Sequence, residues 1–136
     1  MNRGGGLFSE AVSQRLGARI ALFAHRRGLH PTVLTVANLG IGCLVSAVVV
    51  AAAHPVAQGR VWAWPVGLLA LIGWQIAYGL DCADGQLARV TGQTSPAGAR
   101  IDVLCDVAAQ IALVAALAAT AEAQVPETPA WLLAAF

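Results

Sequence analysis

Four aspartates with helical spacing are the residues of this sequence best suited to chemistry. Asp81 and Asp84 are three residues apart, and Asp102 and Asp106 are four apart, so each pair would lie on one face of a helix. Carboxylates brought together cannot all ionise cheaply without a cation, and hard ions such as Mg²⁺ or Mn²⁺ take oxygen ligands. Two such ions about 4 Å apart commonly clamp an in-line displacement at phosphorus. The aspartates therefore predict a site for Mg²⁺ or Mn²⁺, with two ions favoured, that acts on a phosphate ester.

Small and basic residues around the aspartates would suit a phosphate group. Gly85 and Ala88 each follow one of the first two aspartates by one turn, which leaves room beside the carboxylates for a flat group or a diphosphate. Arg89 adds a cation that can pair with phosphate. Gly98 would let the next helix start close to the one before it. These residues predict a phosphate-binding cavity beside the metal site.

Three cysteines, Cys43, Cys82 and Cys105, lie in or beside apolar stretches. We interpret them as packing residues, because a buried free cysteine behaves as a small hydrophobe. Cys82 and Cys105 fall within the aspartate motif, where a soft-metal ligand is conceivable. Four nearby carboxylates favour a hard cation instead.

The aspartates lie at the ends of stretches long enough to cross a membrane. The chain has 136 residues, of which 58% are hydrophobic and only 11% charged, whereas soluble domains carry roughly 25% charged residues. A membrane span needs about 20 residues, and the apolar pattern predicts helices at 32–53, 61–90 and 98–121. Because the connection between the last two is short, both aspartate pairs should meet at one membrane surface. The predicted fold class is all-α integral membrane protein, with one domain over residues 1–136.

Two further segments complete the predicted organisation. Residues 7–27 have apolar side chains at three-to-four spacing and arginines on the other faces, which predicts a basic amphipathic helix in the plane of the membrane interface. Residues 131–136 resemble the opening of a fourth span. We therefore expect the chain to be a fragment of a longer protein.

The distribution of arginine predicts the orientation in the membrane. Most arginines precede the first span or flank the aspartate-bearing connection: Arg3, Arg15, Arg19, Arg26, Arg27, Arg89 and Arg100. The opposite end has only Arg60, together with the aromatic residues Trp62, Trp64 and Trp131, which suit a membrane interface. The positive-inside rule places the N-terminus and the aspartates on the cytoplasmic side of the cytoplasmic (inner) membrane.

The same residues resemble a known family. The pattern D-x-x-D-G-x-x-A-R-x8-G-x3-D-x3-D, from Asp81 to Asp106, is similar to the signature of the CDP-alcohol phosphotransferases, also called CDP-alcohol phosphatidyltransferases, at all eight fixed positions. Pro31 and Thr35 also resemble the family's Pro-Asn-x-x-Thr segment, which opens its first span. Thr32 stands where that segment usually has asparagine, and Asn38 follows one to two turns later. Members usually have six spans, whereas the apolar pattern here predicts three and the start of a fourth.

The resemblance implies an activity and assigns roles. The activity is metal-dependent transfer of a phosphatidyl or substituted phosphoryl group from a CDP-linked donor, such as CDP-diacylglycerol, to an alcohol acceptor, with release of CMP, in phospholipid biosynthesis. Asp81, Asp84 and Asp102 would bind the metals with Asp106 beside them, and Asp106 would be the general base. The cytidine-diphosphate site would comprise Asp81, Gly85, Ala88, Arg89 and Gly98. The family is often dimeric, and small residues in the predicted helix at 98–121 would permit a homodimer.

Three other functions account for part of the pattern. A divalent-cation transporter or channel would explain the carboxylates but not the small residues and arginine at fixed spacing. A membrane prenyltransferase would also hold diphosphate through Mg²⁺, but its acidic motifs are spaced differently. A truncated non-catalytic remnant would fit the way the chain ends. The sequence predicts no nucleic-acid partner, and it does not identify the acceptor alcohol.

Overall fold

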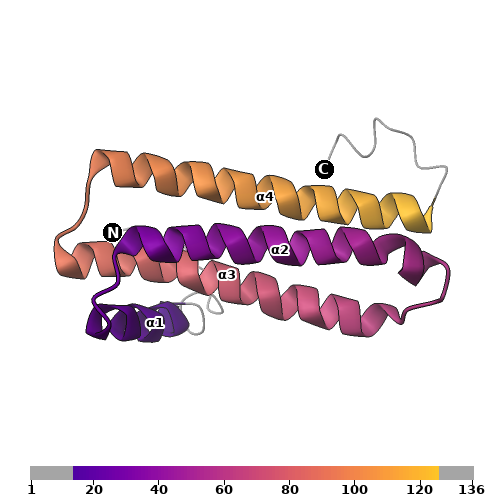
Figure 1. Ribbon diagram of the computed structural model, residues 1–136, viewed down its shortest axis with the longest axis horizontal. Coiled ribbons are helices and arrows are strands. Elements are labelled where there is room, and N and C mark those ends of the chain that lie inside the picture. The colour runs from indigo at the N-terminus through magenta and orange to yellow at the C-terminus, as the bar shows by residue number, and fades with distance from the viewer. Residues whose placement is uncertain (1–13, 126–136) are drawn as a thin grey trace.

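The computed structural model describes residues 14–125, which form four α-helices (Figure 1). They are α1 (Gln14–Arg26), α2 (Pro31–Ala57), α3 (Ala63–Thr91) and α4 (Pro96–Gln124). The predicted all-helical fold is confirmed. The start of the predicted amphipathic helix and the predicted fourth span at 131–136 lie outside the described residues.

Helices α2, α3 and α4 are long and apolar enough to cross a membrane, as the sequence predicts. They contain 27, 29 and 29 residues, and the most apolar windows have mean hydropathies of 2.3, 1.4 and 2.0. The lowest value belongs to α3, which carries much of the polar signature. The protein is thus a multi-pass membrane protein.

The first membrane helix is longer than predicted. Helix α2 continues to Ala57, beyond the predicted end at residue 53, with Pro55 inside its last turn. Proline removes a backbone N–H, and so close to the end this costs the helix little. The N–H of Gln58 then donates to the carbonyl of His54 at 3.0 Å and closes the helix.

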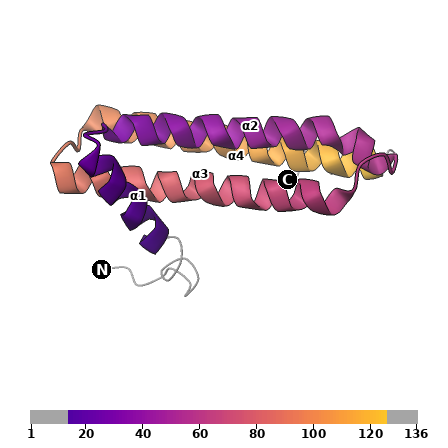
Figure 2. The ribbon, with the colours of Figure 1, turned by 60° about the horizontal axis from the view of Figure 1, so that its bottom comes forward.

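Helix α2 is the platform on which the other two long helices pack. Both α3 and α4 run beside α2, and they make little contact with each other (Figures 1 and 2). A cluster of buried side chains joins the three helices, comprising Val45 and Val49 of α2, Ala70 of α3 and Ala116 of α4. Packing against α2 therefore positions both helices along most of their length.

The short α1 packs across the signature end of α3 (Figure 2). Ala21 and Ala24 of α1 form a second buried cluster with Leu34, Ala83 and Leu87. Gly17 allows the close approach, since a Cβ there would lie 3.0 Å from the Cβ of Cys82. Helix α1 therefore supports the signature segment of α3 from the side that carries Ala83 and Leu87.

Local signals shape the turn between α3 and α4. Helix α3 ends at Gly92, whose φ of +67° is a left-handed conformation that glycine adopts readily. Ser95 caps α4, and its Oγ accepts a hydrogen bond from the N–H of Gly98 at 3.0 Å. Pro96 occupies the first turn, where its missing N–H costs nothing. The turn is consequently short, and it brings the aspartates of α3 and α4 to the same end.

We predict that Gly73→Leu will lower the thermal stability of the detergent-solubilised protein. Gly73 of α3 faces Val45 of α2 so closely that even a Cβ would overlap the valine side chain. Overpacking of this kind costs about 1–3 kcal/mol. Gly67→Leu is the matched control on the same helix, because a Cβ at Gly67 meets open space. Equal unfolding midpoints for the two variants would contradict the packing described for α2 and α3.

Candidate metal centre

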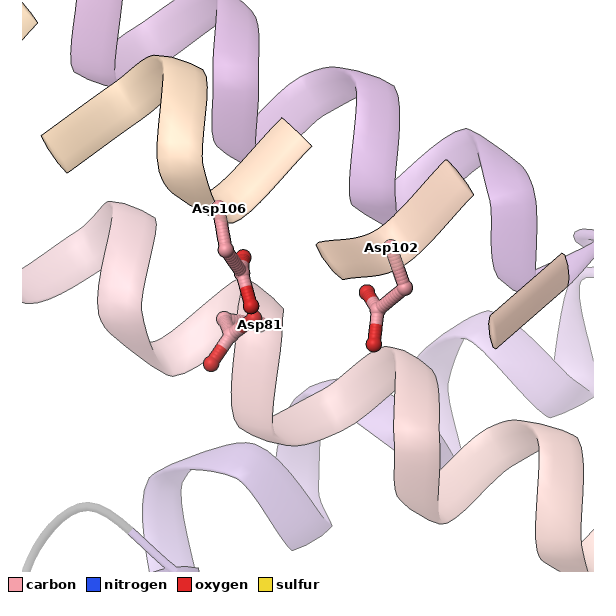
Figure 3. Close-up of side chains that lie close together, drawn as sticks. All are labelled: Asp81, Asp102 and Asp106. Carbon is pink, nitrogen blue, oxygen red and sulfur yellow. The ribbon is translucent and has the colours of Figure 1, made fainter. Parts of the chain in front are cut away.

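Three of the four aspartates converge from two helices. One carboxylate oxygen from each of Asp81, Asp102 and Asp106 lies within 4.8 Å of the other two. Figure 3 shows Asp102 and Asp106 projecting from successive turns of α4 towards α3, where Asp106 meets Asp81. Asp102 and Asp106 are four residues apart on α4 and therefore share one face of the helix, as the sequence predicts.

The fourth aspartate, Asp84, is held by α2. Its Oδ2 accepts a hydrogen bond of 2.6 Å from the hydroxyl of Thr35, and both residues are buried. Asp84 lies outside the group of three carboxylates that are close enough to share an ion. It lines the same cavity as Asp102, however, so it remains adjacent to the centre.

A second contact from α2 reaches Asp106. The Asn38 amide nitrogen donates to Asp106 Oδ1 at 3.4 Å, and Asn38 is itself buried. Thr35 and Asn38 lie about one turn apart on α2, so this helix contacts one aspartate of α3 and one of α4. Sequence reasoning did not place either residue in the site, although both stand in or just after the segment that resembles the family's first span.

The arrangement fits a hard divalent cation. Mg²⁺ binds oxygen at about 2.0–2.1 Å, so oxygens sharing one ion lie at most about 4.2 Å apart. The three carboxylates, with oxygens within 4.8 Å of one another, lie near that limit. In addition, Asp102 Oδ1 is buried and has no hydrogen-bond partner among the described residues. A buried carboxylate oxygen without a donor is costly, and a bound cation would remove that cost.

A cavity of about 200 Å³ adjoins the centre near the α3–α4 turn. We call it the outer cavity; the signature residues that line it are Asp84, Gly85, Ala88, Arg89, Gly98 and Asp102. A Cβ at Gly85 would lie 3.7 Å from Arg89 Nη1, so the guanidinium lies beside the glycine. Four of the five residues predicted to form the nucleotide site thus surround one cavity, while Asp81 does not line it.

A second cavity, also about 200 Å³, lies on the other side of the carboxylates. This inner cavity is lined by Asp81 and Asp106 together with Asn38, Tyr78 and Gln110. Its lining continues along α3 and α4 away from the turn, to Trp74 and Leu113. The carboxylates therefore lie between a cavity at the turn end and one deeper among the membrane-spanning helices.

None of the cysteines joins the group of three carboxylates found among residues 14–125. Cys82 lies against Gly17 of α1. Cys43 is exposed, and Cys105 is partly buried. Cys82 contributes to packing at the α1–α3 contact, as the sequence interpretation expects.

We predict that Asp81→Asn will weaken Mn²⁺ binding, measured by electron paramagnetic resonance in detergent. A lost direct ligand should cost at least as much as the 10–100-fold typical of an outer-shell partner. Glu122→Gln is the matched control, since Glu122 is an exposed carboxylate near the far end of α4. Cys82→Ser and Cys105→Ser should also leave binding intact. Mn²⁺ affinity that is unchanged in Asp81→Asn would remove Asp81 from the ligand set.

The comparisons with known proteins agree with this site. The sequence model of the CDP-alcohol phosphatidyltransferase family matches residues 28–136, which is well over half of the chain and includes every residue of the carboxylate centre. No curated protein and no solved structure matches the chain. The match and the convergence of the signature aspartates lead to one conclusion: the chain belongs to the CDP-alcohol phosphatidyltransferase family.

Proposed function

We propose that the protein transfers a phosphatidyl or substituted phosphoryl group from a CDP-linked lipid or alcohol to a hydroxyl acceptor, and releases CMP. The observation that carries this proposal is the position of the three converging carboxylates beside a cavity lined by the remaining signature residues. A site that only conducts cations would not need an arginine and small residues around such a cavity. Phosphoryl transfer needs both parts.

The outer cavity is the proposed site of the cytidine diphosphate. Arg89 supplies a cation for phosphate, and the lack of side chains at Gly85 and Gly98 keeps the approach to the carboxylates open. The transferred group would extend past the carboxylates into the inner cavity, which leads deeper among the apolar helices. A donor placed in this way would have its diphosphate next to Asp102.

The metal site is proposed to comprise Asp81, Asp102 and Asp106, with Asp84 completing it for a second ion. Mg²⁺ or Mn²⁺, when bound, would neutralise charge on the diphosphate and stabilise the leaving CMP. The role of the carboxylates is to hold the ions in position beside the diphosphate. Thr35 donates to Asp84 Oδ2 and does not contact Oδ1, so Oδ1 is open to an ion on this account.

Asp106 is the proposed general base. It takes the proton from the acceptor hydroxyl as the acceptor oxygen forms a bond to the phosphorus that carries the transferred group. The bond from that phosphorus to the oxygen of CMP breaks, and CMP leaves with the electron pair. The deeper position of Asp106, on the inner cavity, would present the base to an acceptor on the side away from the nucleotide.

The proposed setting is the cytoplasmic membrane. The arginines of α1 lie at the same end of the helices as the α3–α4 turn, and Trp62 and Trp64 are exposed at the opposite end. This distribution supports a cytoplasmic location for the site. Homodimer formation stays a prediction from the sequence.

We predict metal-dependent, cytidine-selective nucleotide binding in nanodiscs. CDP and CMP should bind in the presence of Mg²⁺ or Mn²⁺, and ADP should bind more weakly. Arg89→Gln should weaken CDP binding, whereas Arg60→Gln, at the opposite end of the helices, should not. Folded protein that binds no cytidine nucleotide would contradict the proposed function and favour a remnant. Metal binding without nucleotide binding would favour a cation transporter.

We predict that Asp106→Asn will abolish transfer and preserve CDP binding. General bases contribute about 10²–10⁴-fold to rate, so turnover from a CDP-linked donor should fall by at least the lower figure. The assay follows CMP release with a set of alcohol acceptors. Turnover near that of the unaltered protein would exclude Asp106 as the base and leave the metal site in place.

A further inference from the structure

Helix α2 donates a hydrogen bond to the aspartate proposed as the base. The amide nitrogen of Asn38 lies 3.4 Å from Asp106 Oδ1, across 68 positions of sequence. Only 5% of the Asn38 surface is exposed. A buried amide in the middle of an apolar helix is costly unless its groups are bonded. The Asn38 amide therefore needs a hydrogen-bond partner, and the Asp106 carboxylate is that partner.

We infer that Asn38 is a positioning residue that fixes the orientation of the Asp106 carboxylate. This inference deepens the proposed function, on which its catalytic part rests. The signature contains no residue of α2, so nothing in it assigns this role.

The chemistry of the two groups fixes the direction of the hydrogen bond. The NH₂ of an asparagine side chain can only donate, and an ionised carboxylate can only accept. Asn38 is therefore the donor in this contact, and Asp106 Oδ1 is the acceptor. The amide also removes one rotational choice from the carboxylate, since turning it away would leave the buried NH₂ without a partner.

The position of Asn38 distinguishes it from Thr35. Thr35 bonds to Asp84 and lines the outer cavity, where the nucleotide is proposed to bind. Asn38 bonds to Asp106 and lines the inner cavity. Loss of the Thr35 hydroxyl should therefore change nucleotide or metal affinity, whereas loss of the Asn38 amide should change the rate of the proton-transfer step.

The test begins with a measurement that does not need turnover. Infrared difference spectra should locate the carboxylate stretch of Asp106 as the band lost in Asp106→Asn. In Asn38→Leu, which keeps the branched shape of the side chain but has no donor, this band should shift. The shift should disappear in the double variant with Asp106→Asn. A band that does not move in Asn38→Leu would overturn the inference, whatever the protein's activity proves to be.

Kinetics then test the consequence for transfer. Asn38→Leu should lower kcat about 10–100-fold, the range typical when an outer-shell partner is removed, with little change in the KM of the donor or in Mn²⁺ affinity. Asn38→Asp should be at least as damaging, because it opposes a second negative charge to Asp106. Asn38→Ser, which restores a donor, should recover part of kcat.

A matched control separates positioning from helix packing. Ser46 is also a buried polar residue of α2, and it accepts a hydrogen bond from Trp74 Nε1 of α3 at 3.3 Å. Ser46→Ala should lower stability without lowering kcat. An equal fall in kcat in Ser46→Ala and Asn38→Leu would overturn the positioning role. Absence of transfer in the unaltered protein would count against the proposed function instead, and the infrared result would still decide the contact.

Discussion

The carboxylates are the constraint on which this structure depends, because they are like charges held together among apolar helices. Oxygens of Asp81, Asp102 and Asp106 lie within 4.8 Å of one another, and a membrane offers little water to screen them. Two donors on α2 stabilise part of the negative charge: Thr35 donates to Asp84 and Asn38 donates to Asp106. A divalent cation would neutralise the remaining negative charge of the carboxylates. The packing of α3 and α4 against α2, and of α1 against α3, holds this arrangement in place.

Much of the site could be predicted from the sequence because it depends on local periodicity. The spacing of Asp102 and Asp106 fixes a shared face, and the short connection after Arg89 fixes a shared end. The grouping of Gly85, Ala88, Arg89 and Gly98 around one cavity follows from the same two facts. Capping by Ser95 and the left-handed Gly92 are likewise local signals.

The contacts that could not be predicted join residues far apart in sequence. Thr35 and Asp84 are 49 positions apart, and Asn38 and Asp106 are 68 apart. Helical periodicity says which residues share a face, but not which face of another helix they meet. For the same reason the sequence did not reveal that α2 packs against both signature helices. Asp84, held by Thr35, lines the outer cavity beside Asp102.

The limited contact between α3 and α4 has a mechanical consequence. Among residues 14–125, the two halves of the signature are connected mainly by the turn and by their common neighbour α2. An ion bound by Asp81 of α3 and by Asp102 and Asp106 of α4 would therefore cross-link two helices that otherwise make little contact. Ligand binding that is confined to the folded state stabilises it by mass action. Here the bound ion would mainly stabilise the position of α3 relative to α4. A change that weakens ion binding would therefore also make the relative position of these two helices less rigid.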